Sequence, residues 1–174
     1  MINKWNFQTP TEEELHKRDA LAAEIGFSPV ICLLLVQRGI TTAEEARKFF
    51  KPNLNDLHDP FLMPDMDKAV KRLNRALGNK EKILVYGDYD VDGTTAVSLV
   101  YKYLRPYSST LDYYIPDRYD EGYGISYKGI DYASDNGVTL IISLDCGIKA
   151  IEKIEYAKTK GIDFIICDHH MPDN

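Results

Sequence analysis

The chain has 174 residues, of which 44% are hydrophobic and 28% are charged, a balance typical of a globular protein with one domain or slightly more. Its formal net charge of −6 argues against nucleic-acid binding through bulk positive charge, so any such role must rest on metal ions or local patches. The longest apolar run, residues 30–36, is too short to span a membrane, and we expect no signal peptide. The cysteines have no metal-binding spacing and indicate reduced, mostly buried thiols in a cytoplasmic protein: Cys32, Cys146 and Cys167.

Residues 1–55 are predicted to form an N-terminal helical arm. It should begin with an extended segment, residues 1–10, in which Trp5 and Phe7 serve as anchors. Three helices are then expected, each opened by a Ser or Thr cap and closed by Gly or Pro: residues 11–25, 28–38 and 42–51. This arm has no catalytic pattern, so we interpret it as a structural or docking module.

Residues 56–174 are predicted to form the main domain, a doubly wound α/β fold with a parallel sheet. A linker and an amphipathic helix over residues 65–77 come first, and strand and helix patterns then alternate. Strands are expected over four apolar segments: residues 82–87, 110–115, 138–144 and 163–167. Helices are expected between them: residues 94–104, 126–136 and 149–160. Near-continuous apolar runs such as residues 164–166 are typical of parallel strands covered by helices on both faces.

Acidic and imidazole side chains follow three of the four predicted strands. They are Asp88, Asp90 and Asp92 after the first strand, Asp145 after the third, and Asp168, His169 and His170 after the fourth. Because the carboxyl ends of parallel strands lie at one edge of the sheet, these side chains should converge. Alternation along an extended segment would also direct the first three aspartates to one side. Carboxylates with imidazoles suit Mn²⁺, Zn²⁺ or Fe²⁺, and they predict a pair of ions with a bridging carboxylate.

The aspartate run has two competing interpretations. Asp88, Asp90 and Asp92 copy the first half of an EF-hand loop, but the twelfth position is Leu99 and a strand, not a helix, precedes the run. The run also resembles the nucleophile motif of haloacid dehalogenase-type phosphatases, in which Asp90 would be the nucleophile and Asp92 the acid/base. That interpretation leaves Asp88 and the paired histidines unexplained, so we favour the metal site.

A glycine-rich loop, residues 118–124, follows the second strand on the same edge of the predicted sheet. Arg118 could clamp a phosphate there, and Tyr123 could stack on a base. The same residues are equally compatible with a tight surface loop, and the pattern leaves both interpretations open.

Taken together, the motifs resemble the DHH phosphoesterase family, which is named for the triplet present here at residues 168–170. Residues 88–93 resemble the family's first motif, and residues 145–147 resemble its middle acidic motif. Within the family the chain looks most like the exonucleases specific for single-stranded DNA. Three further segments favour that branch: residues 38–41, 58–66 and 118–124. The resemblance covers nearly the whole chain.

The resemblance implies roles for the metal-binding residues. Asp90 and Asp92 would each bind one of two ions, and Asp145 would bridge them. His169 would complete the shell of the second ion. Some members of the family place a histidine four residues before the Asp90 position, where this chain has Tyr86. Asp88 or water would take its place, and we count Asp88 among the candidate ligands.

The remaining two members of the triplet would act on the substrate and on the ligands. His170 would contact the scissile phosphate or protonate the leaving oxygen. Asp168 would orient a histidine without binding an ion itself.

The implied function is hydrolysis of single-stranded DNA from 5′ to 3′ in recombination and repair, with two Mn²⁺ or Mg²⁺ ions as cofactors. The implied partners are single-stranded DNA, a single-strand-binding protein and a helicase, without a membrane. A DHH phosphodiesterase on short oligonucleotides or cyclic dinucleotides, a pyrophosphatase, and a scaffold with a degenerate site remain alternatives. The pattern indicates the N-terminal part of a larger enzyme, so residues 1–174 alone are expected to be inactive or nearly so.

Overall fold

The computed structural model describes residues 9–172, which fall into two units, one that ends at Leu62 and one that begins at Met63. The sequence pattern places this division slightly earlier, between residues 55 and 56. The expected anchors Trp5 and Phe7 lie outside the described residues. No helix in the described part of the chain is both long and apolar enough to cross a membrane.

The first unit contains the three predicted helices: α1 (Glu12–Ile25), α2 (Pro29–Val36) and α3 (Ala43–Phe50). Reciprocal capping boxes open α1 and α3, at Thr11 with Glu14 and at Thr42 with Glu45. The helices share a small core: Leu21, Cys32, Leu35, Val36 and Ala46. Two short 3₁₀ helices follow, η1 (Leu54–Asp56) and η2 (Pro60–Leu62), in the segment predicted as a linker.

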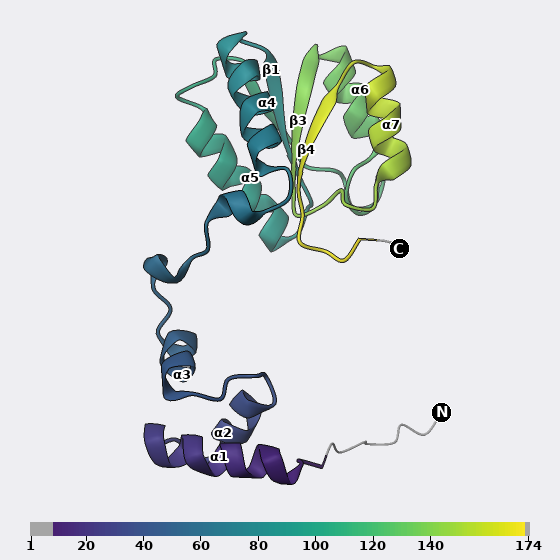
Figure 1. Ribbon diagram of the computed structural model, residues 1–174. Helices are drawn as coiled ribbons and strands as arrows, with labels where there is room; N and C mark the ends of the chain where they lie inside the picture. The colour runs from purple at the N-terminus through teal and green to yellow at the C-terminus, as the bar shows by residue number, and fades with distance from the viewer. Residues whose placement is uncertain (1–8, 173–174) are drawn as a thin grey trace, which may run out of the picture. The chain divides into compact units, whose positions relative to one another are not determined.

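The second unit is a four-stranded parallel sheet with helices on both faces, as the sequence predicted. Its strands, in the spatial order β2-β1-β3-β4, are β1 (Lys82–Gly87), β2 (Leu111–Tyr114), β3 (Val138–Leu144) and β4 (Asp163–Cys167). Its helices are α4 (Met66–Gly78), α5 (Val91–Leu104), α6 (Tyr127–Asp135) and α7 (Ile151–Thr159). Figure 1 shows α4 and α5 on one side of the sheet and α6 and α7 on the other.

Each face of this sheet has its own apolar core, because side chains alternate along β1. Ile83 and Val85 pack against α4 and α5, whereas Leu84 and Tyr86 pack against α6 and α7. All four side chains are fully buried. Burying an aliphatic side chain of this size stabilises the fold by about 1.5–3 kcal/mol, so the central strand anchors both layers.

The strand register fixes which residues meet at the carboxyl edge of the sheet. Gly87, the last residue of β1, pairs with Leu144 of β3, and Leu144 pairs with Cys167 of β4. The residues that follow these three are Asp88, Asp145 and Asp168. Three acidic residues from distant parts of the sequence therefore leave the sheet at one level.

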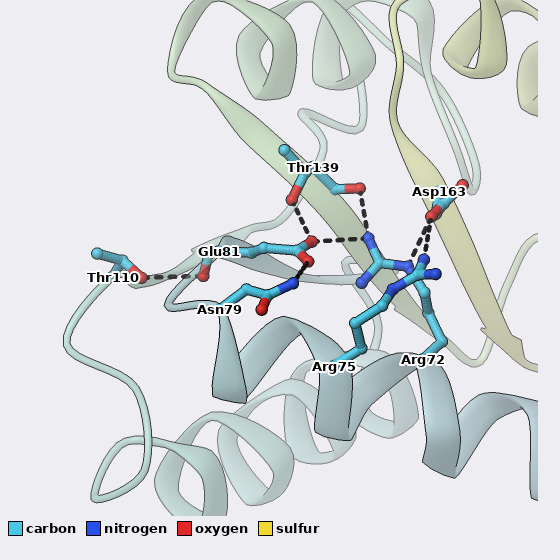
Figure 2. Close-up of polar contacts among 7 residues, drawn as sticks. All are labelled: Arg72, Arg75, Asn79, Glu81, Thr110, Thr139 and Asp163. Atoms are coloured by element: carbon cyan, nitrogen blue, oxygen red, sulfur yellow. Dashed lines mark hydrogen bonds and ion pairs between the residues drawn. The ribbon is translucent and has the colours of Figure 1, made fainter.

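The opposite edge of the sheet is held by Arg72 of α4 (Figure 2). Its Nε donates to Asp163 at 2.6 Å, and its Nη2 donates to Glu81 at 2.8 Å and to the Thr139 carbonyl at 3.2 Å. The Arg72 side chain is only 15% exposed. One guanidinium thus ties α4 to the chain at the starts of β1, β3 and β4.

Removal of this guanidinium should destabilise the second unit. We expect Arg72→Met to lower the unfolding free energy by about 2 kcal/mol, because Glu81 and Asp163 lose hydrogen bonds to a charged donor. The matched control is Lys71→Met on the same helix, whose exposed pair with Asp67 should contribute less than about 0.5 kcal/mol. Urea unfolding of the full chain, followed by circular dichroism, measures both. Equal effects of the two changes would show that the Arg72 network is energetically neutral.

Candidate metal centre

Asp88, at the end of β1, is a fully buried acidic residue. Its Oδ1 accepts a hydrogen bond from the Gly124 N–H at 3.3 Å, but its Oδ2 has no donor among the described residues. A buried carboxylate oxygen without a donor is costly unless a cation or a proton compensates it. This orphaned oxygen is what a ligand of a divalent ion requires, and it fits the predicted metal chemistry.

The expected alternation of the three aspartates along an extended segment is wrong, because the chain is extended only as far as Asp90 and Asp92 already lies in the first turn of α5. Asp90 is the N-cap of α5, and its Oδ1 accepts the Gly93 N–H at 2.9 Å. Asp92 lies exposed in the first turn. The turn packs closely on β1, since a Cβ added at Gly93 would lie 2.5 Å from the Asp88 carbonyl oxygen. Glycine at this position lets the helix begin three residues earlier than predicted.

Asp145, at the end of β3, is the centre of the only group in the described part of the chain that offers three possible metal ligands. Asp145, His169 and His170 each present one ligand atom, and these atoms lie within 4.8 Å of one another. The Asp145 Oδ1 is 3.1 Å from the His169 Nε2. Asp145 has a left-handed backbone with φ 60°, a conformation rare outside glycine that is enriched at functional sites.

Asp168 holds the ring of His170. Its Oδ1 lies 2.7 Å from the His170 Nδ1 and accepts the His170 backbone N–H at 3.1 Å, while its Oδ2 accepts the Ile148 N–H at 3.0 Å. Burial alone would raise the pKa of Asp168, but these donors hold that pKa below its usual value. The hydrogen bond to Asp168 in turn raises the pKa of His170, and the charges of Asp145 and Asp90 add to the effect.

Tyr123 and Arg118 face the same edge from the loop that follows β2. The Tyr123 hydroxyl donates to the Asp145 carbonyl at 3.3 Å and lies 3.5 Å from the His170 Nε2. Burial, and then the charges of nearby aspartates, raise the pKa of Tyr123 to about 12, so the hydroxyl keeps its proton at neutral pH. Arg118 lies over the ring of Tyr89, with 5.3 Å from its Cζ to the ring centre. Tyr89 is a site residue that the sequence analysis missed, although it stands within the aspartate run.

The structure brings together only part of the ligand set that the sequence predicted. Asp145 and His169 are within reach of one ion, and His170 joins them, but the other predicted ligands, Asp88, Asp90 and Asp92, lie outside that group. Asp90 is committed to capping α5. It still lines a cavity of about 580 Å³ that Tyr123 and His170 also line.

Tyr86 is a core residue and not a ligand. It is fully buried, its ring stacks on Tyr114, and its hydroxyl donates to the Gly124 carbonyl at 2.9 Å. Of the two groups expected to replace the missing histidine, Asp88 has the free oxygen. The three cysteines are free thiols, as predicted. Cys32 and Cys146 are buried, whereas Cys167 is exposed.

The parallel fold, with carboxylates and imidazoles gathered at the carboxyl ends of its strands, defines an α/β protein with a candidate metal site. Residues 82–174 match the family model described as the N-terminal domain of the DHH family. The match covers more than half of the chain, and the chain therefore belongs to the DHH family.

Curated relatives of the chain are exonucleases named RecJ and described as specific for single-stranded DNA. The protein from Bacillus subtilis (strain 168) is 40% identical over 169 residues, which are 97% of this chain and 21% of that protein. The protein from Escherichia coli (strain K12) is 34% identical over 161 residues, or 91% of this chain and 27% of that protein. The chain thus spans about a quarter of the length of these relatives.

Two solved structures resemble the chain. Exonuclease RecJ bound to manganese has a TM-score of 0.57 and 30% identity, over 62% of this chain and 28% of that one. RecJ from Thermus thermophilus in complex with Mn²⁺ has a TM-score of 0.65 over 91% of this chain and 22% of that one. At 23% identity the second likeness shows the fold alone.

The pairing of His170 with Asp168 can be tested by titration. A negative carboxylate stabilises the protonated imidazole and a neutral amide does not, so Asp168→Asn should lower the pKa of His170 toward its ordinary value of 6.5. NMR titration of the His170 ring in the metal-free chain measures this pKa. The control is Asp163→Asn, which removes a charge from the far end of β4 and should leave the pKa unchanged. An unchanged pKa in Asp168→Asn would contradict the assigned pairing.

Proposed function

We propose that the chain carries the metal-binding edge of a phosphodiesterase that removes nucleotides from the 5′ end of single-stranded DNA, with two Mn²⁺ or Mg²⁺ ions. The observation that carries this proposal is the group of Asp145, His169 and His170, together with the buried Asp88, one oxygen of which has no partner in the part of the chain that the structure describes. Carboxylate with imidazole is a donor set that suits Mn²⁺. The manganese in the RecJ structures and the names of the curated relatives support the choice of metal and substrate.

Five residues would hold the ions: Asp88, Asp90, Asp92, Asp145 and His169. Bound there, divalent ions would supply Lewis acidity toward phosphoryl oxygens and a nucleophile at neutral pH. The partly buried carboxylate of Asp145, only 12% exposed, is suited to a bridging position. Asp90 would bind one ion through its second carboxylate oxygen, since its Oδ1 caps α5.

The other residues of the edge would bind and orient the substrate. Arg118, held over Tyr89, would pair with a phosphate, and the exposed ring of Tyr123 would stack on a base. His170 would hold a proton for the leaving oxygen, because its raised pKa keeps more of the imidazole protonated near neutral pH. Asp168 would fix the ring through Nδ1, which leaves Nε2 toward the cavity.

The size of the cavity supports a single strand as substrate. About 580 Å³ lies within the range of roughly 300–1,000 Å³ that is usual for small-molecule sites. It suits one nucleotide, whereas a duplex of about 20 Å width, judged from its grooves, would not enter. The 5′ polarity rests on the family resemblance alone.

Metal binding should depend on Asp145. We expect Asp145→Asn to weaken Mn²⁺ binding by about tenfold or more, because the variant loses a charged ligand shared by two ions. Asp135→Asn, which removes an exposed charge at the end of α6, is the control and should bind Mn²⁺ like the wild type. Isothermal titration calorimetry compares the three proteins, and equal affinity for wild type and Asp145→Asn would remove Asp145 from the site.

The substrate can be tested with the full-length protein and end-labelled oligonucleotides. We expect Mn²⁺-dependent release of the 5′ label from single-stranded DNA, with blunt duplex spared. Asp92→Ala should slow this release by about a hundredfold or more, since a metal ligand is lost. Asp135→Asn again serves as the control with full activity. Equal cleavage of both substrates, or earlier release of a 3′ label, would favour a phosphodiesterase that acts on short oligonucleotides.

A further inference from the structure

We propose that Glu121 and Tyr86 are positioning residues, which together hold the loop of residues 117–124 against the metal-binding edge. This inference rests on the proposed function, because the loop carries Arg118 and Tyr123. It assigns a task to two polar side chains, the buried Tyr86 and the partly buried Glu121, that are neither ligands nor substrate contacts.

Glu121 joins three parts of the fold through one carboxylate. It accepts hydrogen bonds from the Tyr114 hydroxyl at 2.9 and 3.0 Å, from the Asp117 N–H at 2.9 Å, and from the Ser126 hydroxyl. Tyr114 ends β2, Asp117 opens the loop, and Ser126 caps α6. Although burial would raise the pKa of Glu121, these donors keep it below its usual value, so the carboxylate stays ionised. The turn is closed because the Glu121 N–H also donates to the Asp117 carbonyl at 2.9 Å.

Tyr86 holds the far end of the same loop from within the core. Its hydroxyl donates to the Gly124 carbonyl at 2.9 Å and accepts the Ser126 N–H at 3.1 Å. Burial raises the pKa of Tyr86, so the hydroxyl keeps the proton that it donates. The ring cannot shift freely, since it stacks on Tyr114 with 5.4 Å between the ring centres.

The two anchors bracket the residues that reach the site. Between Glu121 and Gly124 lie Gly122 and Tyr123, and the Tyr123 hydroxyl reaches the Asp145 carbonyl and the His170 ring. The Gly124 N–H donates to Asp88, the residue with the unpaired carboxylate oxygen. Loop position and metal edge are therefore joined by direct hydrogen bonds. Misplacing a reactive group by about 1 Å can cost about a hundredfold in rate, so a loosened loop should weaken substrate binding and turnover.

A matched control separates positioning from simple stability. Tyr132 of α6 also packs on Tyr114, with 5.1 Å between ring centres, and its hydroxyl donates to Asp112 at 2.9 Å. Tyr132→Phe removes a hydroxyl from the same core without touching the loop. Tyr86→Phe and Glu121→Gln are the test variants, and both keep most of the side-chain volume.

The first measurement does not depend on activity. Trypsin should cut the bond after Arg118 several-fold faster in Tyr86→Phe and Glu121→Gln than in the wild type and Tyr132→Phe, because loss of an anchor makes local unfolding of this already exposed loop more frequent. Mass spectrometry of the fragment that ends at Arg118 follows this cut in the full-length protein. Equal rates in all four proteins would overturn the proposed anchor.

The second measurement tests the consequence for the substrate. Tyr86→Phe and Glu121→Gln should raise the KM for single-stranded DNA about tenfold, while Tyr132→Phe keeps the wild-type KM. A KM unchanged in the test variants, or raised equally in Tyr132→Phe, would overturn the positioning role. A wild type that cleaves no DNA would overturn the proposed function, and the trypsin rates would still decide on the anchor.

Discussion

The shared level at which β1, β3 and β4 end is the constraint on which the candidate site depends. Parallel pairing of Gly87 with Leu144, and of Leu144 with Cys167, places the residue after each strand at one edge. A slip of one residue in either pairing would turn the side chains of that strand to the opposite face of the sheet. The fully buried side chains of β1 fix this register, and the position of the site therefore depends on the core.

The amino ends of the strands carry a stabilising network, whereas their carboxyl ends carry the candidate site. At the amino edge, Arg72 pairs with Glu81, Asp163 and the Thr139 carbonyl, although its Nη1 has no partner among the described residues. At the carboxyl edge, the buried Asp88 keeps an unpaired oxygen and Asp145 holds a left-handed backbone, which costs about 1 kcal/mol or more. The core of the sheet and the network at the amino edge can offset such costs, as expected where a site requires side chains that the fold alone would not favour.

The sequence was most informative where burial dominates. The bounds of β1, β3 and β4 agree with the prediction because apolar runs end in clear turn signals. The start of α5 was misplaced because Asp90 was interpreted as a ligand on an extended chain, whereas its local role is to cap a helix. Convergence of the strand ends followed from parallel topology, so Asp145, His169 and His170 could be predicted to meet. Tyr86 and Glu121 could not be assigned, because their partners lie on other elements and leave no local pattern.

The electrostatics of this edge link metal binding to the binding of a phosphate. A chain of net charge −6 repels a polyanion at long range, and the carboxylates of Asp88, Asp90 and Asp145 would repel a phosphate further. Two divalent ions would add four positive charges where these carboxylates converge, so the edge would reverse the sign of its field only once the ions are bound. In the proposed site, Arg118 would complete this positive environment, and the guanidinium lies over the ring of Tyr89. Under the proposed function, charge would therefore set the order of binding, with the ions bound before the DNA strand and the loop in place before a phosphodiester is hydrolysed.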